Sequence, residues 1–361
     1  MKKTLFAVSA LLSATGFAQT FSDNFDSYTA GQYMADQSSG EWTTWGNAPG
    51  TAEDVMVSSA DSYSGPNSVY FSTSAQAGGP TDLVRNFGVL NTGQFSMEFN
   101  IKVESGKAGY LNFQKNATVG QTWAMDCYFN DDGTLTINNL AGLNFSGSYT
   151  QGTWFNFRID INFNTNHWEV FIDNNSIGSF SNPENQIASI NIYPSDQNSP
   201  YSSGYFIDDF QYTVTPYTLP NLNAAVTLIS FDQGQIAGAS VTPKVKVRNL
   251  GTTAINSFDL DVVYNGNTIS QQVTGLNLAS LAETTITMPG TASLIAGVND
   301  MVATVSNVNG GTDGDAADDT GTLSIDPVVP AEGKMVVGEE GTGTWCQWCP
   351  HGAVFMDMME T

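Results

Sequence analysis

The clearest feature of the first half of the chain is a strict alternation of apolar and polar side chains. In residues 93–103 (GQFSMEFNIKV) every second position from Phe95 to Val103 is apolar, and polar residues stand between them. Residues 154–163 (WFNFRIDINF) repeat the pattern. A period of two is typical of a β-strand with one buried face. We therefore predict that both segments are strands of a sheet.

Turn-forming residues separate segments of this kind. The run NDDG at 130–133 stands before TLTI, and DNN at 173–175 interrupts an apolar run. Such short polar and glycine-containing runs are typical of hairpin turns. No long window has the period of an α-helix. Residues 19–217 are therefore predicted to form an all-β, two-sheet sandwich.

A second β segment is predicted over residues 222–326. It follows the proline-marked linker TPYTLPN at 215–221, and its apolar Val245 and Val247 alternate with basic residues. An Asn-Gly-Asn hairpin turn follows at 265–267. Short strands at regular spacing favour an immunoglobulin-like sandwich.

The N-terminus has the pattern of a secretory signal peptide. Lys2 and Lys3 precede a short apolar run, and small residues occupy the positions before a cleavage site after Ala18. The apolar run is too short for the ~30 Å of a bilayer's hydrocarbon core. Residues 1–18 are therefore predicted to be a signal peptide, with no transmembrane segment in the chain and a secreted or outer-surface location.

The charge of the chain is strongly acidic. It contains 35 acidic and 11 basic residues, which gives a net charge of −24. Nucleic acid and anionic membrane surfaces would repel such a protein. The negative charge is compatible with Ca²⁺ binding, although a solvated acidic surface explains it equally well.

The only cysteine pair with a redox spacing lies in residues 333–361. Cys346 and Cys349 follow an apolar strand candidate and precede an apolar helix candidate. At the start of a helix, free N–H groups and the helix dipole stabilise a thiolate and lower its pKa from ~8.5 towards ~3.5–7.5. Cys346 would be the attacking thiolate, and Cys349 would resolve the mixed disulfide. This order is typical of a thioredoxin-like domain.

Two other interpretations of the pair stay open. A static disulfide is compatible with an oxidising compartment. A zinc site needs two further ligands, and the chain offers only Cys127, His167 and His351. Cys127 itself stands in a strand-like run and is interpreted as a small buried apolar residue.

A structural calcium site is a further hypothesis. Asp208 shares the parity of Phe206 and Phe210, which predicts an inward-facing carboxylate. Asp26, Asp208 and Asp209 together could supply some of the oxygens that Ca²⁺ needs. The alternative is that these acids cap turns by accepting backbone N–H groups. The acidic run at 311–321 lacks the order of a calcium-binding loop and is interpreted as a solvated loop.

Catalytic motifs are otherwise missing from the sequence. A glycosidase needs two acids on one face of a strand, and no such run occurs. Two histidines 184 positions apart, His167 and His351, cannot form a zinc peptidase motif. Trp154 precedes its strand's apolar set by one position, so it is predicted to face outward, where an indole can stack on a sugar ring.

Several stretches resemble known families. Residues 245–266 (VKVRNLGTTAINSFDLDVVYNG) are similar to bacterial cell-adhesion-related immunoglobulin-like modules, and residues 339–352 (EEGTGTWCQWCPHG) to the outer-membrane-protein-related thioredoxin-like family of Bacteroidetes. Four stretches resemble the concanavalin-like, laminin-G-like jelly rolls of secreted Bacteroidetes-type proteins: FSDNFDSYTAGQY (21–33), SYSGPNSVYFS (62–72), GTWFNFRIDINFNTNHWEVFIDNNSIGSF (152–180) and YFIDDFQY (205–212).

These resemblances imply a modular surface protein of a Gram-negative bacterium. Its expected parts are a signal peptide (1–18), a jelly roll (19–217), an adhesion-type spacer (222–326) and an incomplete thioredoxin-like domain (333–361). The first functional hypothesis is a binding or adhesion protein for glycans or surface proteins that carries a thiol–disulfide module. The alternative is an extracellular thiol–disulfide oxidoreductase with its own partner protein, in which the β domains act only as spacers.

Overall fold

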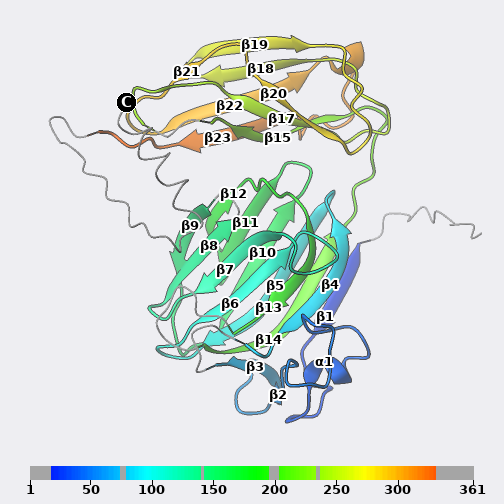
Figure 1. The fold of residues 1–361 in the computed structure, drawn as a ribbon, viewed down its shortest axis with the longest axis vertical. Helices are drawn as coiled ribbons and strands as arrows, with labels where there is room; N and C mark the ends of the chain where they lie inside the picture. The colour runs from blue at the N-terminus through cyan, green and yellow to red at the C-terminus, as the bar shows by residue number, and fades with distance from the viewer. Residues whose placement is uncertain (1–17, 74–78, 140–141, 195–202, 233–235, 331–361) are drawn as a thin grey trace, which may run out of the picture.

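A computed structural model describes residues 18–73, 79–139, 142–194, 203–232 and 236–330, and in this part of the chain the fold is all-β. The helical elements there are one turn of α-helix, α1 (Met34–Gln37), and one 3₁₀ turn, η1 (Val308–Gly310). Within these described ranges, no helix has both the length and the apolar character needed to span a membrane. The strands form two separate sandwiches (Figure 1).

An eight-stranded antiparallel sheet forms one layer of the first sandwich. The first strand of the sandwich pairs with the last, since Phe21 lies opposite Tyr212. Seven of its strands are hydrogen-bonded in one continuous spatial order, and β1 pairs with β14 outside that order. The strands are β12 (Asn175–Phe180), β11 (His167–Ile172), β10 (Phe155–Asn162), β5 (Gln94–Val103), β14 (Gly204–Thr215), β3 (Ser68–Ser72), β2 (Val57–Ser58) and β1 (Gln19–Asp23).

A six-stranded antiparallel sheet forms the other layer. Side chains from both layers meet in one apolar core, in which Phe99, Phe113 and Phe157 are fully buried. In spatial order its strands are β4 (Leu83–Leu90), β13 (Ile187–Ile192), β6 (Gly109–Gln114), β7 (Trp123–Phe129), β8 (Thr134–Asn139) and β9 (Gly142–Ser148).

The alternation in the sequence accounts for the core-facing residues of the first sandwich. The predicted strands at 93–103 and 154–163 are β5 and β10, and they pair with Phe157 opposite Phe99 and Ile159 opposite Met97. All four of these side chains are fully buried. The prediction of an all-β sandwich is confirmed here, because apolar residues two apart share one face of a strand.

The second sandwich is built from a three-stranded and a four-stranded sheet, with a small two-stranded sheet beside them. Its own core includes Val245 and Val247, as the alternation predicts. The sheets are β15 (Ala224–Ser230), β17 (Lys244–Asn249) and β20 (Glu283–Thr287); β19 (Asn267–Val273), β18 (Phe258–Tyr264), β22 (Asn299–Ser306) and β23 (Thr320–Ile325); and β16 (Ser240–Val241) with β21 (Ala292–Ser293).

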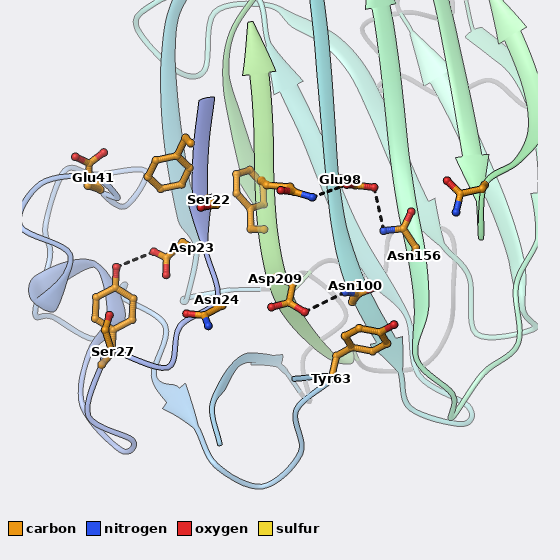
Figure 2. A pocket seen from close by; sticks show the side chains of 15 residues that line it. Ser22, Asp23, Asn24, Ser27, Glu41, Tyr63, Glu98, Asn100, Asn156 and Asp209 are labelled. Atoms are coloured by element: carbon orange, nitrogen blue, oxygen red, sulfur yellow. Dashed lines mark hydrogen bonds between the residues drawn. The ribbon is translucent and has the colours of Figure 1, made fainter. Parts of the chain in front are cut away.

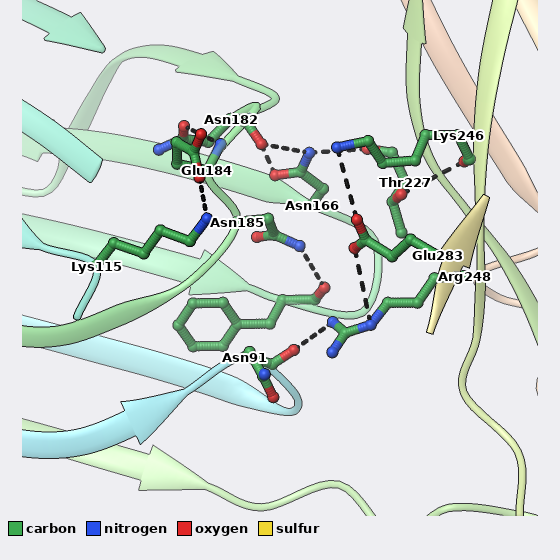
Figure 3. Close-up of polar contacts among 11 residues, drawn as sticks. Asn91, Lys115, Asn166, Asn182, Glu184, Asn185, Thr227, Lys246, Arg248 and Glu283 are labelled. Atoms are coloured by element: carbon green, nitrogen blue, oxygen red, sulfur yellow. Dashed lines mark hydrogen bonds and ion pairs between the residues drawn. The ribbon is translucent and has the colours of Figure 1, made fainter. Parts of the chain in front are cut away.

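The two sandwiches meet through polar contacts (Figure 3). The side-chain amide of Asn166, in the turn after β10, donates to the backbone oxygen of Thr227 at 2.8 Å. The guanidinium of Arg248 donates to the backbone oxygen of Asn91. Arg248 stands on the face of β17 opposite to the core residues Val245 and Val247, yet its side chain is only 4% exposed at this contact.

Two predicted segments lie outside the described residues. The signal peptide falls almost entirely within residues 1–17, and the cysteine pair Cys346 and Cys349 falls within residues 331–361. The thioredoxin-like domain therefore stays a prediction. Cys127 is fully buried and unbonded in β7, as its position in an apolar run indicates.

Candidate functional site

The outward face of the six-stranded sheet combines aromatic and amide side chains. On β6 the side chains of Leu111 and Phe113 enter the core, so Tyr110 and Asn112 point the other way. On β7 the same alternation turns Tyr128 outward. A cavity of about 480 Å³ lies on this face. We call it the aromatic pocket, and it is lined by Trp45, Asp82, Tyr110, Asn112, Trp123, Asp126, Tyr128, Asn191 and Tyr193.

Five aromatic rings form most of the walls of the aromatic pocket. The rings of Trp45 and Trp123 are 6.0 Å apart between centroids and tilted by 31°. Tyr110 lies 4.9 Å from Tyr128 and 6.4 Å from Tyr193. Both indoles are half-buried. Rings that remain partly exposed beside a cavity offer flat apolar surfaces to a ligand.

Amide side chains form a polar row at the pocket, and two of them, Asn112 and Asn191, line it. Asn112 donates to the oxygen of Asn191 at 3.1 Å, and Gln114 donates to the oxygen of Asn112 at 2.5 Å. All three are nearly fully buried. The amide nitrogen of Asn191 has no hydrogen-bond partner. Because an unpaired buried donor is unfavourable, this nitrogen is suited to a ligand's acceptor.

Two carboxyl groups border the aromatic pocket. Burial raises the pKa of Asp82 to about 7, and the nearby carboxylates of Glu53 and Asp54 add to the effect. Burial also raises the pKa of Asp126, whose carboxylate accepts a hydrogen bond from the Tyr110 hydroxyl at 2.5 Å. No lysine or arginine lines the pocket. Its ionisable aspartates therefore disfavour an anionic ligand.

Trp45 reaches the pocket on an irregular segment between α1 and β2. Thr43 pairs with Val84 next to this point, and the Trp45 N–H donates to the carboxylate of Asp82 at 2.6 Å. The loop after β6 passes beneath the indole at Gly120, where an added Cβ would lie 3.1 Å from a ring carbon. Gly120 also has a φ of +82°, which a side chain would strain.

The eight-stranded sheet has a second, larger cavity of about 920 Å³ on its outward face. Figure 2 shows that polar side chains from adjacent strands line it. We call it the polar groove, and its lining includes Ser22, Asp23, Glu41, Tyr63, Glu98, Asn100, Asn156 and Asp209.

The carboxylates of the polar groove already accept hydrogen bonds from neighbouring side chains. Glu98 accepts from Gln211 at 2.5 Å and from Asn156 at 3.4 Å (Figure 2). Asp23 accepts from the Tyr28 hydroxyl at 2.7 Å. Among its four rings, Phe210 is fully buried, Phe21 and Tyr28 are half-buried and Tyr63 is 56% exposed. The groove thus has three partly exposed rings, against four in the aromatic pocket.

The three acids of the predicted calcium site all contact the loop at residues 62–67. Asp208 accepts the N–H groups of Tyr63 at 2.8 Å and Ser64 at 3.0 Å. It is fully buried, but the prediction that it faces the core is wrong, because it pairs with Asn100 on the outward face of β5 and this loop covers it. Asp209 accepts from the Ser64 hydroxyl at 2.8 Å. Asp26 accepts the N–H of Asn67 at 3.2 Å.

These contacts correspond to the alternative that acids hold turns through N–H groups. Burial raises the pKa of Asp208, while its backbone hydrogen bonds act in the opposite direction. In the described ranges, three acidic groups lie within 4.8 Å of one another only at Asp313, Asp318 and Asp319. Asp26, Asp208 and Asp209 do not form such a group, and calcium binding there stays a prediction.

Trp154 is half-buried near the eight-stranded sheet and lines neither cavity. Its indole N–H donates to Asp61 at 3.1 Å, and its ring lies 6.0 Å from that of Tyr63. Trp42 and Trp168 are core residues. The Trp154 ring has one exposed aromatic neighbour, Tyr63, whereas five rings surround the aromatic pocket. Sugar binding by Trp154 stays a prediction.

Sequence reasoning missed the aromatic pocket, although a signal for it exists. In GYLNFQ, Tyr110 and Asn112 have the opposite parity to the apolar pair Leu111 and Phe113. The parity test that selects Trp154 would have selected Tyr110 and, in WAMDCYF, Tyr128. No local pattern identifies Trp45, which belongs to an irregular segment.

No protein-family model matches the chain, and no curated protein matches it. Among solved structures, the CARDB domain of a Pyrococcus furiosus protein, solved in complex with di-metal ions, is 19% identical, with a TM-score of 0.26; the match covers 32% of this chain and 95% of that one. A galectin from Caenorhabditis elegans is 10% identical, with a TM-score of 0.28, and the match covers 40% of this chain and 94% of the galectin. An alginate lyase of polysaccharide lyase family 7 is 10% identical, with a TM-score of 0.33, and the match covers 45% of this chain and 82% of the lyase. At such scores the function of the pocket has to be argued from its own geometry.

Proposed function

We propose that this chain is a secreted or cell-surface modular protein that binds neutral glycans in the aromatic pocket. The observation that carries the proposal is the grouping of Trp45, Trp123 and three tyrosines around a buried row of amides. Sugar rings have apolar C–H faces that stack on aromatic rings, and hydroxyls that pair with amides and carboxylates. A volume of about 480 Å³ lies within the ~300–1,000 Å³ usual for small-molecule sites.

The chemistry of the pocket favours a neutral glycan over an acidic one. Asp82 and Asp126 border the cavity, and the lining contains no basic side chain. A uronate or a sialic acid would meet these carboxylates without a compensating cation. Hydroxyl groups of a neutral sugar can instead donate to the carboxylates and accept from the amide nitrogen of Asn191.

The remaining parts of the chain are assigned supporting roles in this proposal. The first sandwich is a jelly roll that carries the binding site, and the second is an immunoglobulin-like spacer of the adhesion type. The polar contacts of Asn166 and Arg248 that join them support a defined spacing between the binding face and whatever follows. The pattern of a signal peptide at residues 1–18 supports a location outside the cytoplasm.

A glycan array probed with the full chain tests the proposal. We expect binding to a set of neutral oligosaccharides and much weaker binding by Trp123→Ala. Trp154→Ala is the matched control, because it removes the same indole from the opposite sheet. Absence of binding to every neutral glycan would overturn the proposal, and loss of binding in Trp154→Ala alone would move the site to the eight-stranded sheet.

A second proposed activity is thiol–disulfide exchange at Cys346 and Cys349, which rests on their spacing and flanking residues in the sequence. Reduction of insulin by the full-length protein tests it, with Cys346→Ser as the comparison. Equal rates for the two proteins would eliminate exchange and leave a static disulfide.

A further inference from the structure

A second group of acidic residues lies in the second sandwich, in the loop between η1 and β23. One carboxylate oxygen each from Asp313, Asp318 and Asp319 lies within 4.8 Å of the other two. The sequence interpretation of this loop as solvated is wrong for Asp318, which is only 1% exposed. A carboxylate at such a position needs partners for its oxygens.

Several buried oxygens at this point have no hydrogen-bond partner. Asn223, which stands immediately before β15 and is fully buried, donates to Asp318 at 3.1 Å. The amide oxygen of Asn223 and the second carboxylate oxygen of Asp318 accept no hydrogen bond, and one oxygen of Asp319 is also unpaired. Oxygen atoms of Asn223, Asp318 and Asp319 are thus available to coordinate a cation.

The cluster also lacks a neutralising side chain. None of the ion pairs in the described ranges involves Asp313, Asp318 or Asp319. Three carboxylates this close together, without a cationic side chain beside them, favour the uptake of a metal ion.

We propose that Asp313, Asp318 and Asp319, together with the amide oxygen of Asn223, form a Ca²⁺ site. All of the donors are oxygens, which a hard cation prefers, and no sulfur or imidazole is present to favour zinc. Calcium accepts six to eight oxygens in flexible geometry, so second carboxylate oxygens and water can complete the shell. This site is distinct from the predicted one at Asp26, Asp208 and Asp209.

The position of the site links it to the connection between the two sandwiches. Tyr217, in the linker before β15, donates to Asp315 at 3.0 Å and accepts from Asn223 at 2.9 Å. The N–H of Ala224 donates to Asp313 at 2.8 Å. A bound Ca²⁺ would therefore fasten the linker and the start of β15 to the loop before β23, and so stiffen the spacer where it leaves the first sandwich.

Terbium luminescence and calorimetry of the full chain test this site. Tyr217 is near enough to sensitise a bound Tb³⁺, so we expect luminescence that Ca²⁺ displaces. In differential scanning calorimetry, 1 mM CaCl₂ should raise the melting temperature of the second sandwich by about 5–10 °C over EDTA, the shift expected for a well-saturated single site.

Asp318→Asn keeps an oxygen for the Asn223 amide but removes the charge. We expect this variant to lose the calcium-dependent shift and the displaceable luminescence while melting no lower than the wild type in EDTA. Asp300→Asn, an exposed acid in the same sandwich, is the control and should respond to calcium as the wild type does. A wild type without a calcium shift, or an Asp318→Asn variant with the full shift, would overturn the proposal.

Discussion

The aromatic pocket and the polar groove lie on opposite layers of one sandwich, and both are built from the outward positions of alternating strands. In the groove, Glu98 and Asp23 bind their neighbours' donors. In the pocket, aromatic rings surround a buried amide row in which Asn191 retains an unpaired donor. The groove also has an unpaired amide atom, the oxygen of Asn156, so this feature does not separate the two cavities. The larger cavity is the less suitable one for a sugar because partly exposed ring faces, rather than volume, create affinity.

The largest effect expected from this comparison is on Trp123. Trp123→Ala should weaken binding of a recognised oligosaccharide by about 30-fold, the effect of ~2 kcal/mol for an aromatic platform. Isothermal titration calorimetry with the best array ligand measures it. Trp154→Ala should bind like the wild type, and equal losses in the two variants would contradict the difference between the faces.

A smaller effect is expected at the amide row. Asn191→Ala removes the unpaired nitrogen, so we expect roughly a fivefold loss of affinity, about 1 kcal/mol for one hydrogen bond. Asn100→Ala, an amide on β5 that donates to Asp209 in the groove, is the matched change. Undiminished affinity in Asn191→Ala would exclude this nitrogen from ligand contact.

Changes of pH should affect stability through Asp82. Its pKa is raised from 3.8 to about 7, so the folded state holds this proton more tightly than the unfolded state does. The unfavourable contribution of the charged Asp82 carboxylate to the free energy of folding is therefore complete above pH 7. It decreases progressively as the pH falls from about 7 towards 3.8, so the protein becomes more stable. Asp82→Asn should raise the melting temperature by about 3 °C at pH 8 and by little at pH 5. Equal gains at the two pH values would contradict this assignment.

The smallest effect is expected in the polar groove. Glu98→Gln retains an acceptor for Gln211, so glycan affinity should change by less than about twofold, as expected for a group that makes no ligand contact. Titration calorimetry under the conditions used for Trp123→Ala provides the comparison. A tenfold loss would show that the groove, rather than the pocket, takes the sugar.

Local pattern predicts the elements of the fold well, because it acts through local physics. The alternation from Phe95 to Val103 fixes which side of β5 enters the core, and the Asn265-Gly266 turn fixes the hairpin between β18 and β19. Parity fails at Asp208, because the register of β14 shifts between Asp208 and Gln211 and leaves Asp208 on the face opposite to Phe210. The loop at 62–67, which no local pattern predicts, buries it instead.

The candidate sites depend on pairings that no local pattern encodes. Asn112 meets Asn191 only because β6 and β13 are neighbours in the sheet. Asn223 meets Asp318 across 95 positions of sequence. Trp45 belongs to no regular strand. Sequence patterns describe which face a residue occupies, whereas the assembly of a site also requires the order of strands across the sheet.

The most direct test of glycan binding in the aromatic pocket is a titration followed by NMR of the indole N–H signals. With a neutral oligosaccharide selected on the array, the signals of Trp45 and Trp123 should shift together and saturate, while those of Trp42, Trp154 and Trp168 stay in place. A saturating shift of Trp154 with Trp45 and Trp123 unchanged would contradict the account.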